Sequence, residues 1–227
     1  SDVCSSDLFE FRAVGSSAST AFPITVLNAA VAEGMTDVIA ILKDALKSGK
    51  KNEEAIMETV RKVVRETEKV RFEGNGYSDE WVKEAARRGL PNLRKTPEAL
   101  AQLGETKAIE VFSKFGIFSS AEVHSRLHVR LERYVKNLQI EVDTLRSMID
   151  TQILPACYAY SGDLAISVKA NLDAGVPAPQ KDTLVKLNAL LTSLHAKRKE
   201  FESVHQKAEG TVGEEEKAKL YAGEIST

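Results

Sequence analysis

Two long apolar stripes at helical spacing constrain the fold of this chain more than any other feature. In each stripe an apolar residue recurs every three or four positions, which is the spacing of one face of an α-helix. The turn at residues 174–180 separates the stripes, so the two helices are predicted to pack as an antiparallel hairpin. The first stripe comprises Leu127, Leu131, Tyr134, Leu138, Val142, Leu145, Ile149 and Ile153, and the second comprises Leu184, Leu187, Leu191, Leu194 and Phe201.

Both stripes are interrupted. Pro155 is predicted to kink or interrupt the first helix, because its ring clashes with the carbonyl of Thr151. Arg198 and His205 interrupt the second stripe, which argues against a long dry seam. We therefore favour a helical core within one chain over an oligomerisation zipper, which remains the alternative. After the proline, helical spacing resumes at Tyr158, Leu164, Val168 and Leu172.

Helix signals occupy most of the remaining chain, so the predicted fold class is mainly α. An Ala-rich helix is expected from Pro23 to Ser48, buried on most sides, and a second helix from 52 to 72. Short helices follow, with N-caps at Ser78 and Thr96 and another at 105–115, and the first long helix opens with the capping-box pair Ser119 and Glu122. Residues 214–227 begin a further helix without a cap or apolar closure, which we interpret as a truncation.

One segment departs from the helical pattern. Residues 9–12, Phe-Glu-Phe-Arg, alternate apolar and charged side chains, as a strand with one buried face does. Glu10 and Arg12 are two residues apart and therefore share one face of that strand. No sheet partner is evident in a chain of helices, so we expect the last strand of an α+β domain. An ordinary exposed ion pair on a strand is the alternative.

Composition excludes several classes of function. The chain has 31 Lys and Arg against 33 Asp and Glu, so no charge excess indicates a nucleic-acid partner. No unbroken run of about 18 apolar residues is present, so no membrane span is expected. Beyond the first eight residues Cys157 stands alone, which fits a cytoplasmic setting. His124 and His128 have a zinc-compatible spacing but no evident third ligand, so surface histidines are favoured.

The first eight residues, Ser-Asp-Val-Cys-Ser-Ser-Asp-Leu, are set apart from the fold. They resemble the translation of a sequencing-adapter oligonucleotide, and they are excluded in the way that a cloning scar would be. A genuine polar tail is the alternative.

Several ordered segments resemble type III glutamine synthetase: FEFRAVGSS at 9–17, FEGNGYSDEWVKEAARRGLPNLRKTPEAL at 72–100, KAIEVFSKFGIFSSAEVHSR at 107–126, LERYVKNLQIEVDTL at 131–145 and QILPACYAYSGDL at 152–164. The resemblance covers essentially all of the chain after Leu8. It implies a glutamate–ammonia ligase, which forms glutamine through a γ-glutamyl phosphate at the expense of ATP, with Mg²⁺ or Mn²⁺. It also implies a homo-oligomer of stacked rings.

The resemblance also assigns two site residues. Glu10 stands at the family's metal-ligand position nearest the ATP phosphates, and Arg12 stands at a position that binds the substrate glutamate and the developing phosphate charge. Mg²⁺ prefers six oxygens in a near-octahedral array, which one carboxylate cannot supply. The remaining site residues of the family would lie upstream, so we expect this chain alone to be inactive.

Three segments follow from these readings. Residues 1–8 are the adapter-like segment, 9–47 are the tail of a glutamine synthetase catalytic domain, and 48–227 are a helical C-terminal domain with the long hairpin, truncated at its end. The alternative function is a non-catalytic helical module for interaction or oligomerisation.

Overall fold

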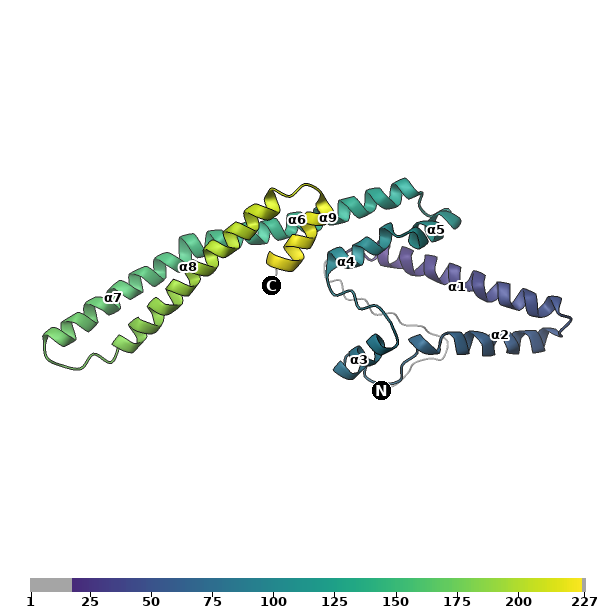
Figure 1. Cartoon of the computed structure of the whole chain (residues 1–227), viewed down its shortest axis with the longest axis horizontal. Helices are drawn as coiled ribbons and strands as arrows, with labels where there is room; N and C mark the ends of the chain where they lie inside the picture. The colour runs from purple at the N-terminus through teal and green to yellow at the C-terminus, as the bar shows by residue number, and fades with distance from the viewer. Residues whose placement is uncertain (1–17, 226–227) are drawn as a thin grey trace. The chain divides into compact units, whose positions relative to one another are not determined.

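The computed structural model describes residues 18–225, and every regular element in that range is helical (Figure 1). The predicted mainly α class is confirmed. The expected strand at 9–12, with Glu10 and Arg12, lies outside the described residues. The described residues divide into two compact units, one of residues 18–91 with 110–117 and the other of residues 92–109 with 118–225.

In the first unit, α1 (Ala21–Lys47) and α2 (Asn52–Glu66) pack against each other across a tight turn at Gly49. Gly49 has a φ of 84°, which L side chains rarely adopt. The short helix η1 (Glu68–Val70) and helix α3 (Asp79–Arg87) follow. The predicted N-cap at Ser78 is confirmed, because its side chain accepts a hydrogen bond from the amide of Trp81.

Helix α1 departs from its expected burial on most sides. Ala29 is its one fully buried residue, whereas Ile24, Val31 and Met35 are each more than half exposed. By length and hydropathy α1 alone among the described helices could cross a membrane, a test that the core helix of a soluble protein also passes. Glu33 and Asp37 divide the apolar residues of α1, so the helix contains no unbroken apolar run of the length of a membrane span.

The second unit is built on a long antiparallel hairpin, as predicted. Its first arm is α6 (Ser120–Met148), the π-turn η3 (Ile149–Ile153) and α7 (Leu154–Asp173), and its second arm is α8 (Lys181–Glu209). Figure 1 shows α7 and α8 side by side along their length, in agreement with their contacts. The capping box of Ser119 and Glu122 opens α6 as expected.

Short elements complete the unit at the base of the hairpin. Helix α4 (Thr96–Ala101) and the turn η2 (Gln102–Gly104) contact α6, and α5 (Thr106–Lys114) follows them, with residues 110–114 belonging to the first unit. Helix α4 begins at Thr96 itself, with Lys95 as its N-cap, so the predicted cap was one residue late. Helix α9 (Glu214–Leu220) and the π-turn η4 (Tyr221–Ile225) fold back onto α6 and α8.

Two apolar clusters hold the hairpin together. The cluster at its base joins α6, α8, α9 and η4, and the cluster further along joins η3, α7 and α8. Tyr221 at the end of the chain is fully buried, so the expectation that this end lacks apolar closure was wrong. The buried members are Leu131, Val135, Val142, Ala208, Ala218 and Tyr221 in the base cluster, and Ile149, Leu154 and Leu191 in the other.

The interruption predicted at Pro155 takes the form of the π-turn, in which the amide of Leu154 donates to the carbonyl of Ile149. A π-turn adds one residue to a helix. The seam, which is the row of side chains on the first arm that pack against α8, therefore continues at Leu154 instead of Ile153. Ile153 is accordingly 40% exposed and Leu154 is buried. The predicted apolar face included Ile153, Tyr158 and Leu172. It was wrong at these three positions, because their side chains are 40–55% exposed.

Candidate functional site

The two residues predicted to carry chemistry, Glu10 and Arg12, lie outside the described residues, so their geometry stays a prediction. Within residues 18–225 no group of three His, Cys, Asp or Glu side chains could hold a metal ion. His124 and His128 are both exposed, and the ring of His124 contacts the carbonyl of Ser120 at 2.8 Å. Both are therefore surface histidines, as the sequence favoured. Three polar clusters of the described residues remain as candidate sites.

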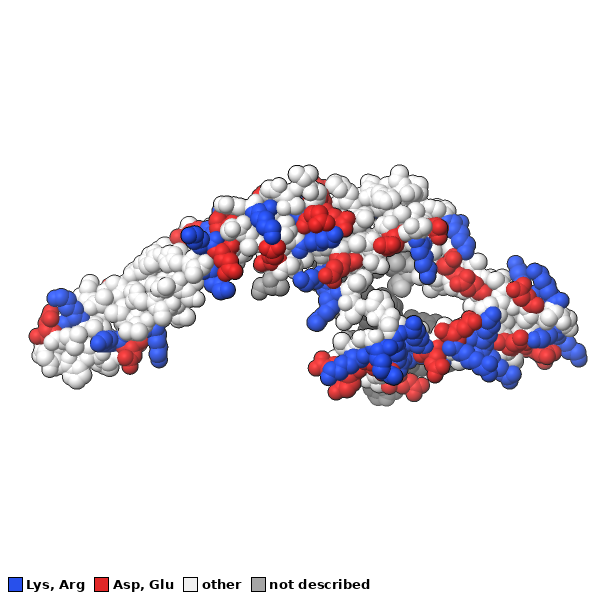
Figure 2. All heavy atoms as spheres, in the orientation of Figure 1, with Lys and Arg blue, Asp and Glu red and all other residues white. Residues whose placement is uncertain are grey.

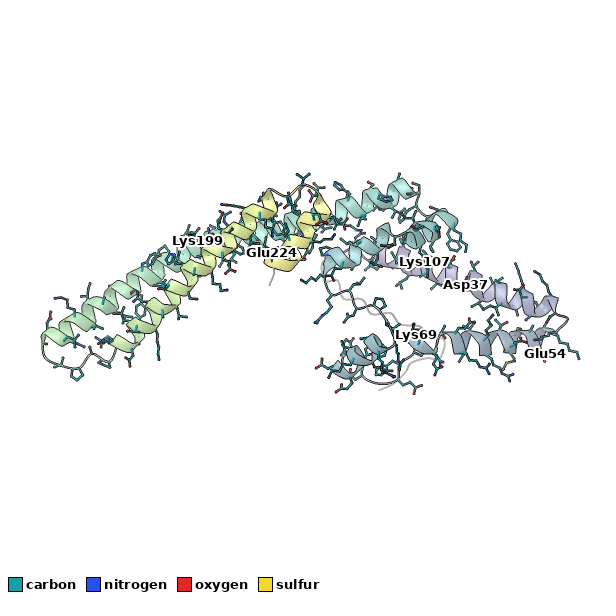
Figure 3. All side chains as sticks on the ribbon, viewed as in Figure 1. Asp37, Glu54, Lys69, Lys107, Lys199 and Glu224 are labelled. Carbon is teal, nitrogen blue, oxygen red and sulfur yellow. The ribbon has the colours of Figure 1, made fainter. Side chains whose placement is uncertain are left out.

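The first cluster lines an open groove beside η1 and α3, with a volume of about 630 Å³. Figure 3 labels Lys69 on η1, one of its lining residues. Arg87 and Arg88 both donate to the carboxylate of Glu84, at 2.6–2.8 Å, and these hydrogen bonds lower the pKa of Glu84 to about 2. Arg88 also donates to the carbonyl of Arg71 at 2.7 Å. The guanidinium groups that line this groove therefore connect α3 to the segment after α2.

An aromatic stack supports that groove. The rings of Phe72 and Trp81 stack with their centroids 4.2 Å apart, and the guanidinium of Arg88 lies 5.5 Å from the Trp81 ring. Stacking and cation–π attraction thus fix the loop after η1 on α3. The cluster explains the local fold, and the guanidinium groups of Arg87 and Arg88 already have acceptors in the protein.

The second cluster surrounds Tyr221 at the base of the hairpin. The Tyr221 hydroxyl donates to Glu209 at 2.9 Å and lies 3.3 Å from Nδ1 of His205, and Gln139 on α6 also donates to Glu209. Burial is the main cause that raises the pKa of Tyr221 well above its ordinary value, followed by the hydrogen bond to Glu209. The hydroxyl therefore stays protonated and acts as a structural donor. Beside it Lys207 pairs with Glu224, labelled on η4 in Figure 3, at 2.9 Å.

The third cluster joins α8 to the π-turn through Arg198. Its guanidinium donates two hydrogen bonds to Asp150, at 2.9 and 3.4 Å, and one to Glu202 at 2.7 Å. Arg146 on α6 contacts the same Glu202 at 3.1 Å. The hydrogen bonds from Arg198 are the leading cause that lowers the pKa of both Asp150 and Glu202.

Sequence reasoning noted Arg198 and His205 as interruptions of an apolar stripe but found partners for neither. The partner of Arg198 lies 48 residues earlier, in the π-turn. The partner of His205 is a tyrosine beyond a short acidic helix. The sequence did indicate that partners exist, because Arg198 and His205 lie on the apolar face of the helix and a polar residue buried there needs a hydrogen-bonding partner.

The third cluster predicts an acid-sensitive hairpin. The carboxylates of Asp150 and Glu202 have lower pKa values in the folded chain than their ordinary values of 3.8 and 4.5. Their contribution to stability is therefore present above those ordinary values and is lost as the pH falls through the lowered ones. We expect the melting temperature, followed by helical circular dichroism, to fall between about pH 5 and pH 2.

The double variant Asp150→Asn, Glu202→Gln is the control for this prediction, because it removes the two titrating groups. Its melting temperature should fall less over the same pH range than that of the parent. Equal acid sensitivity of the two proteins would show that other carboxylates dominate.

Comparison with known proteins places the fold in a family. Residues 55–171 match the glutamine synthetase C-terminal domain family, which is about half of the chain. This chain therefore belongs to the glutamine synthetase C-terminal domain family, as the resemblance of its segments indicated. The match covers the elements from α2 to α7.

Three glutamine synthetases are similar to this chain over part of their length. The chain is 39% identical over 163 residues to the type-3 glutamine synthetase of Dictyostelium discoideum, which is 71% of this chain and 22% of that protein. It is 38% identical over 156 residues to a glutamine synthetase of Bacteroides fragilis, covering 69% of this chain and 21% of that protein. A glutamine synthetase of Butyrivibrio fibrisolvens is 34% identical over 182 residues, covering 78% and 26%. The matched region thus spans about a fifth to a quarter of each relative.

Proposed function

We propose that this chain serves in a type III glutamine synthetase as the helical region beside the catalytic domain. The observation that supports this most is the family match over α2 to α7, together with 34–39% identity to three glutamine synthetases. The reaction is the ligation of ammonia to glutamate. The γ-carboxylate of glutamate attacks the terminal phosphorus of ATP and ADP leaves, and ammonia then attacks the acyl carbon and phosphate leaves.

Glu10 and Arg12 are the residues of this chain that we assign to the reaction. Glu10 supplies one carboxylate to a Mg²⁺ or Mn²⁺ ion at the ATP phosphates, and Arg12 binds glutamate and the phosphate charge by its guanidinium fork. The described residues contain no three-ligand cluster, so the other ligands come from elsewhere in the enzyme. The ion, when bound, neutralises charge on the transferring phosphoryl group.

The exposed apolar side of α1 fits the same proposal. Its side chains Val31, Met35 and Ile39 are 44–59% exposed in a helix that meets the hydropathy of a membrane span. Such a surface is unstable in water unless it is covered. We infer that the rest of the catalytic domain of the enzyme covers this surface, and that residues 9–47 form the end of that domain. A homo-oligomer in the cytoplasm is the setting that the family resemblance implies.

A chimera tests the proposal. Residues 9–227 replace the segment of the Dictyostelium type-3 enzyme that contains the 163 aligned residues and the residues flanking them, and γ-glutamyl hydroxamate formation is measured after purification. We expect the chimera to be active and this chain alone to be inactive. Because a metal contributes several kcal/mol to such a transfer, and each 1.36 kcal/mol is tenfold, Glu10→Gln in the chimera should lower the rate at least about 100-fold.

Glu53→Gln is the matched control, since Glu53 is an exposed carboxylate in the first turn of α2. It should leave the rate unchanged. An assembled chimera without activity, or one in which Glu10→Gln equals Glu53→Gln, would contradict the proposal. Activity of the chain alone above its own Glu10→Gln variant would contradict the expected inactivity. If the chain is instead a non-catalytic interaction module, neither substitution should change the rate of the chimera.

A further inference from the structure

The second arm of the hairpin carries a strict seven-residue repeat. Its seam positions alternate in steps of three and four from Leu184 to Ala208, and Arg198 and His205 occupy two of them. A repeat of this kind fits its partner helix in several alignments that differ by seven residues, or about 10 Å along the helix. The apolar members alone are Leu184, Leu187, Leu191, Leu194, Phe201 and Ala208.

The middle of the hairpin contains little that would select one alignment. Residues 151–162 of the first arm and 187–196 of the second contain no Asp, Glu, Lys or Arg. Figure 2 shows this stretch as an uncharged surface, with charged side chains beyond it at both ends. The polar contacts that cross it are the exposed pairs of Asn188 with Ser161 and of His195 with Tyr158. Exposed pairs of this kind contribute little.

We infer that Arg198 sets the register of the hairpin, by fixing α8 lengthwise against the π-turn. Its side chain is only 16% exposed, and its fork reaches Asp150 while a third donor reaches Glu202. In the alignment shifted by seven residues toward the loop, the guanidinium would lie at Cys157, in a stretch without a carboxylate. In the opposite shift it would lie at Asp143, whose carboxylate Arg146 already binds.

The fork therefore penalises both neighbouring alignments, in addition to the stability that its ion pairs contribute at neutral pH. Removing one partner of a partly buried ion pair lowers stability, because it leaves the other charge unpaired, and a polar residue at one seam position can in addition specify register. Leucine at position 198 would complete the apolar repeat.

Disulfide trapping in the full chain tests this inference. The background carries Cys4→Ser and Cys157→Ala, and each reporter pairs Ser161→Cys with one second cysteine. Asn188→Cys reports the observed alignment, since Asn188 contacts Ser161 at 3.2 Å. His195→Cys and Lys181→Cys, seven residues to either side, report the two shifted alignments. Cross-linking is followed by electrophoresis after mild oxidation.

We expect the parent to cross-link only through position 188. Arg198→Leu should add a cross-link at 195 or 181 in at least about 10% of the folded molecules, a population that a shifted state of similar energy would have. Arg198→Lys keeps the charge but not the fork, so it should give a smaller but measurable shifted fraction. Cross-linking at 188 alone in Arg198→Leu would overturn the inference. If that variant does not fold, the same result in Arg198→Lys overturns it.

Discussion

Truncation of Tyr221 to alanine is expected to lower the free energy of unfolding of the hairpin unit by about 3–5 kcal/mol, the range for a large aromatic side chain removed from a core. Tyr221 has no exposed surface and lies in the cluster formed by α6, α8 and α9. Its loss would leave a cavity there and would also remove the hydrogen bond to Glu209. The last elements of the chain, α9 and η4, should detach first, because Tyr221 is the largest side chain that anchors them.

The measurement is urea unfolding followed by circular dichroism, with two comparison variants. Tyr77→Ala removes the same atoms from a side chain that is 92% exposed, so it should change the stability by no more than about 0.5 kcal/mol. Tyr221→Phe keeps the ring and should cost about 1–3 kcal/mol, because the part-buried hydrogen bond to the charged carboxylate of Glu209 is lost. Equal effects of Tyr221→Ala and Tyr77→Ala would contradict the assigned role of Tyr221.

Tyr221 also illustrates what the sequence could not reveal. It follows three glutamates and two lysines in a short segment, so local composition indicates an exposed end. Its burial depends on Leu131 and Val135, about 90 residues earlier, and no local pattern encodes such a contact. Helix α1 shows the converse, because its composition indicates burial although the described chain leaves it largely uncovered.

Features with local causes were predicted correctly. Ser78 and the pair of Ser119 and Glu122 cap their helices because their side-chain oxygens reach amides three residues away. The antiparallel hairpin followed from stripe spacing, and Pro155 correctly marked an interruption. The candidate site residues Glu10 and Arg12 are different in kind, because their assignment rests on family resemblance and lies outside the described residues.

The seam beyond Pro155 was predicted wrongly, because periodicity assumes an unbroken helix. From Ile149 onward the residues that face α8 are at positions 154, 157, 161, 164, 168 and 171. In an unbroken α-helix, at about 100° per residue, these positions would point on average roughly 90° away from Ile149. That offset equals one extra residue, which is what a π-turn inserts. The first arm therefore contains one residue more than its seam requires.

Deletion of Pro155 is accordingly expected to be tolerated, whereas insertion of one alanine after Gln152 should disrupt the hairpin. The deletion removes the extra residue together with the ring that opposes a regular helix, and Ile153 then takes the seam place of Leu154. Isoleucine in place of leucine at a packed position lowers the free energy of unfolding by less than about 1.5 kcal/mol. The insertion adds a second extra residue, turns α7 by about a further 100°, and exposes Leu154, Leu164 and Val168.

At about 1.5–3 kcal/mol for each buried side chain, the insertion should cost at least about 5 kcal/mol. Thermal unfolding and amide hydrogen exchange across α7 measure both variants. In a regular helix a deletion and an insertion at one point rotate the distal half by equal and opposite angles, so they should be equally harmful. The prediction is therefore the asymmetry itself. Equal losses in the two variants would mean that the π-turn is a distortion imposed by Pro155 and that the seam does not require it.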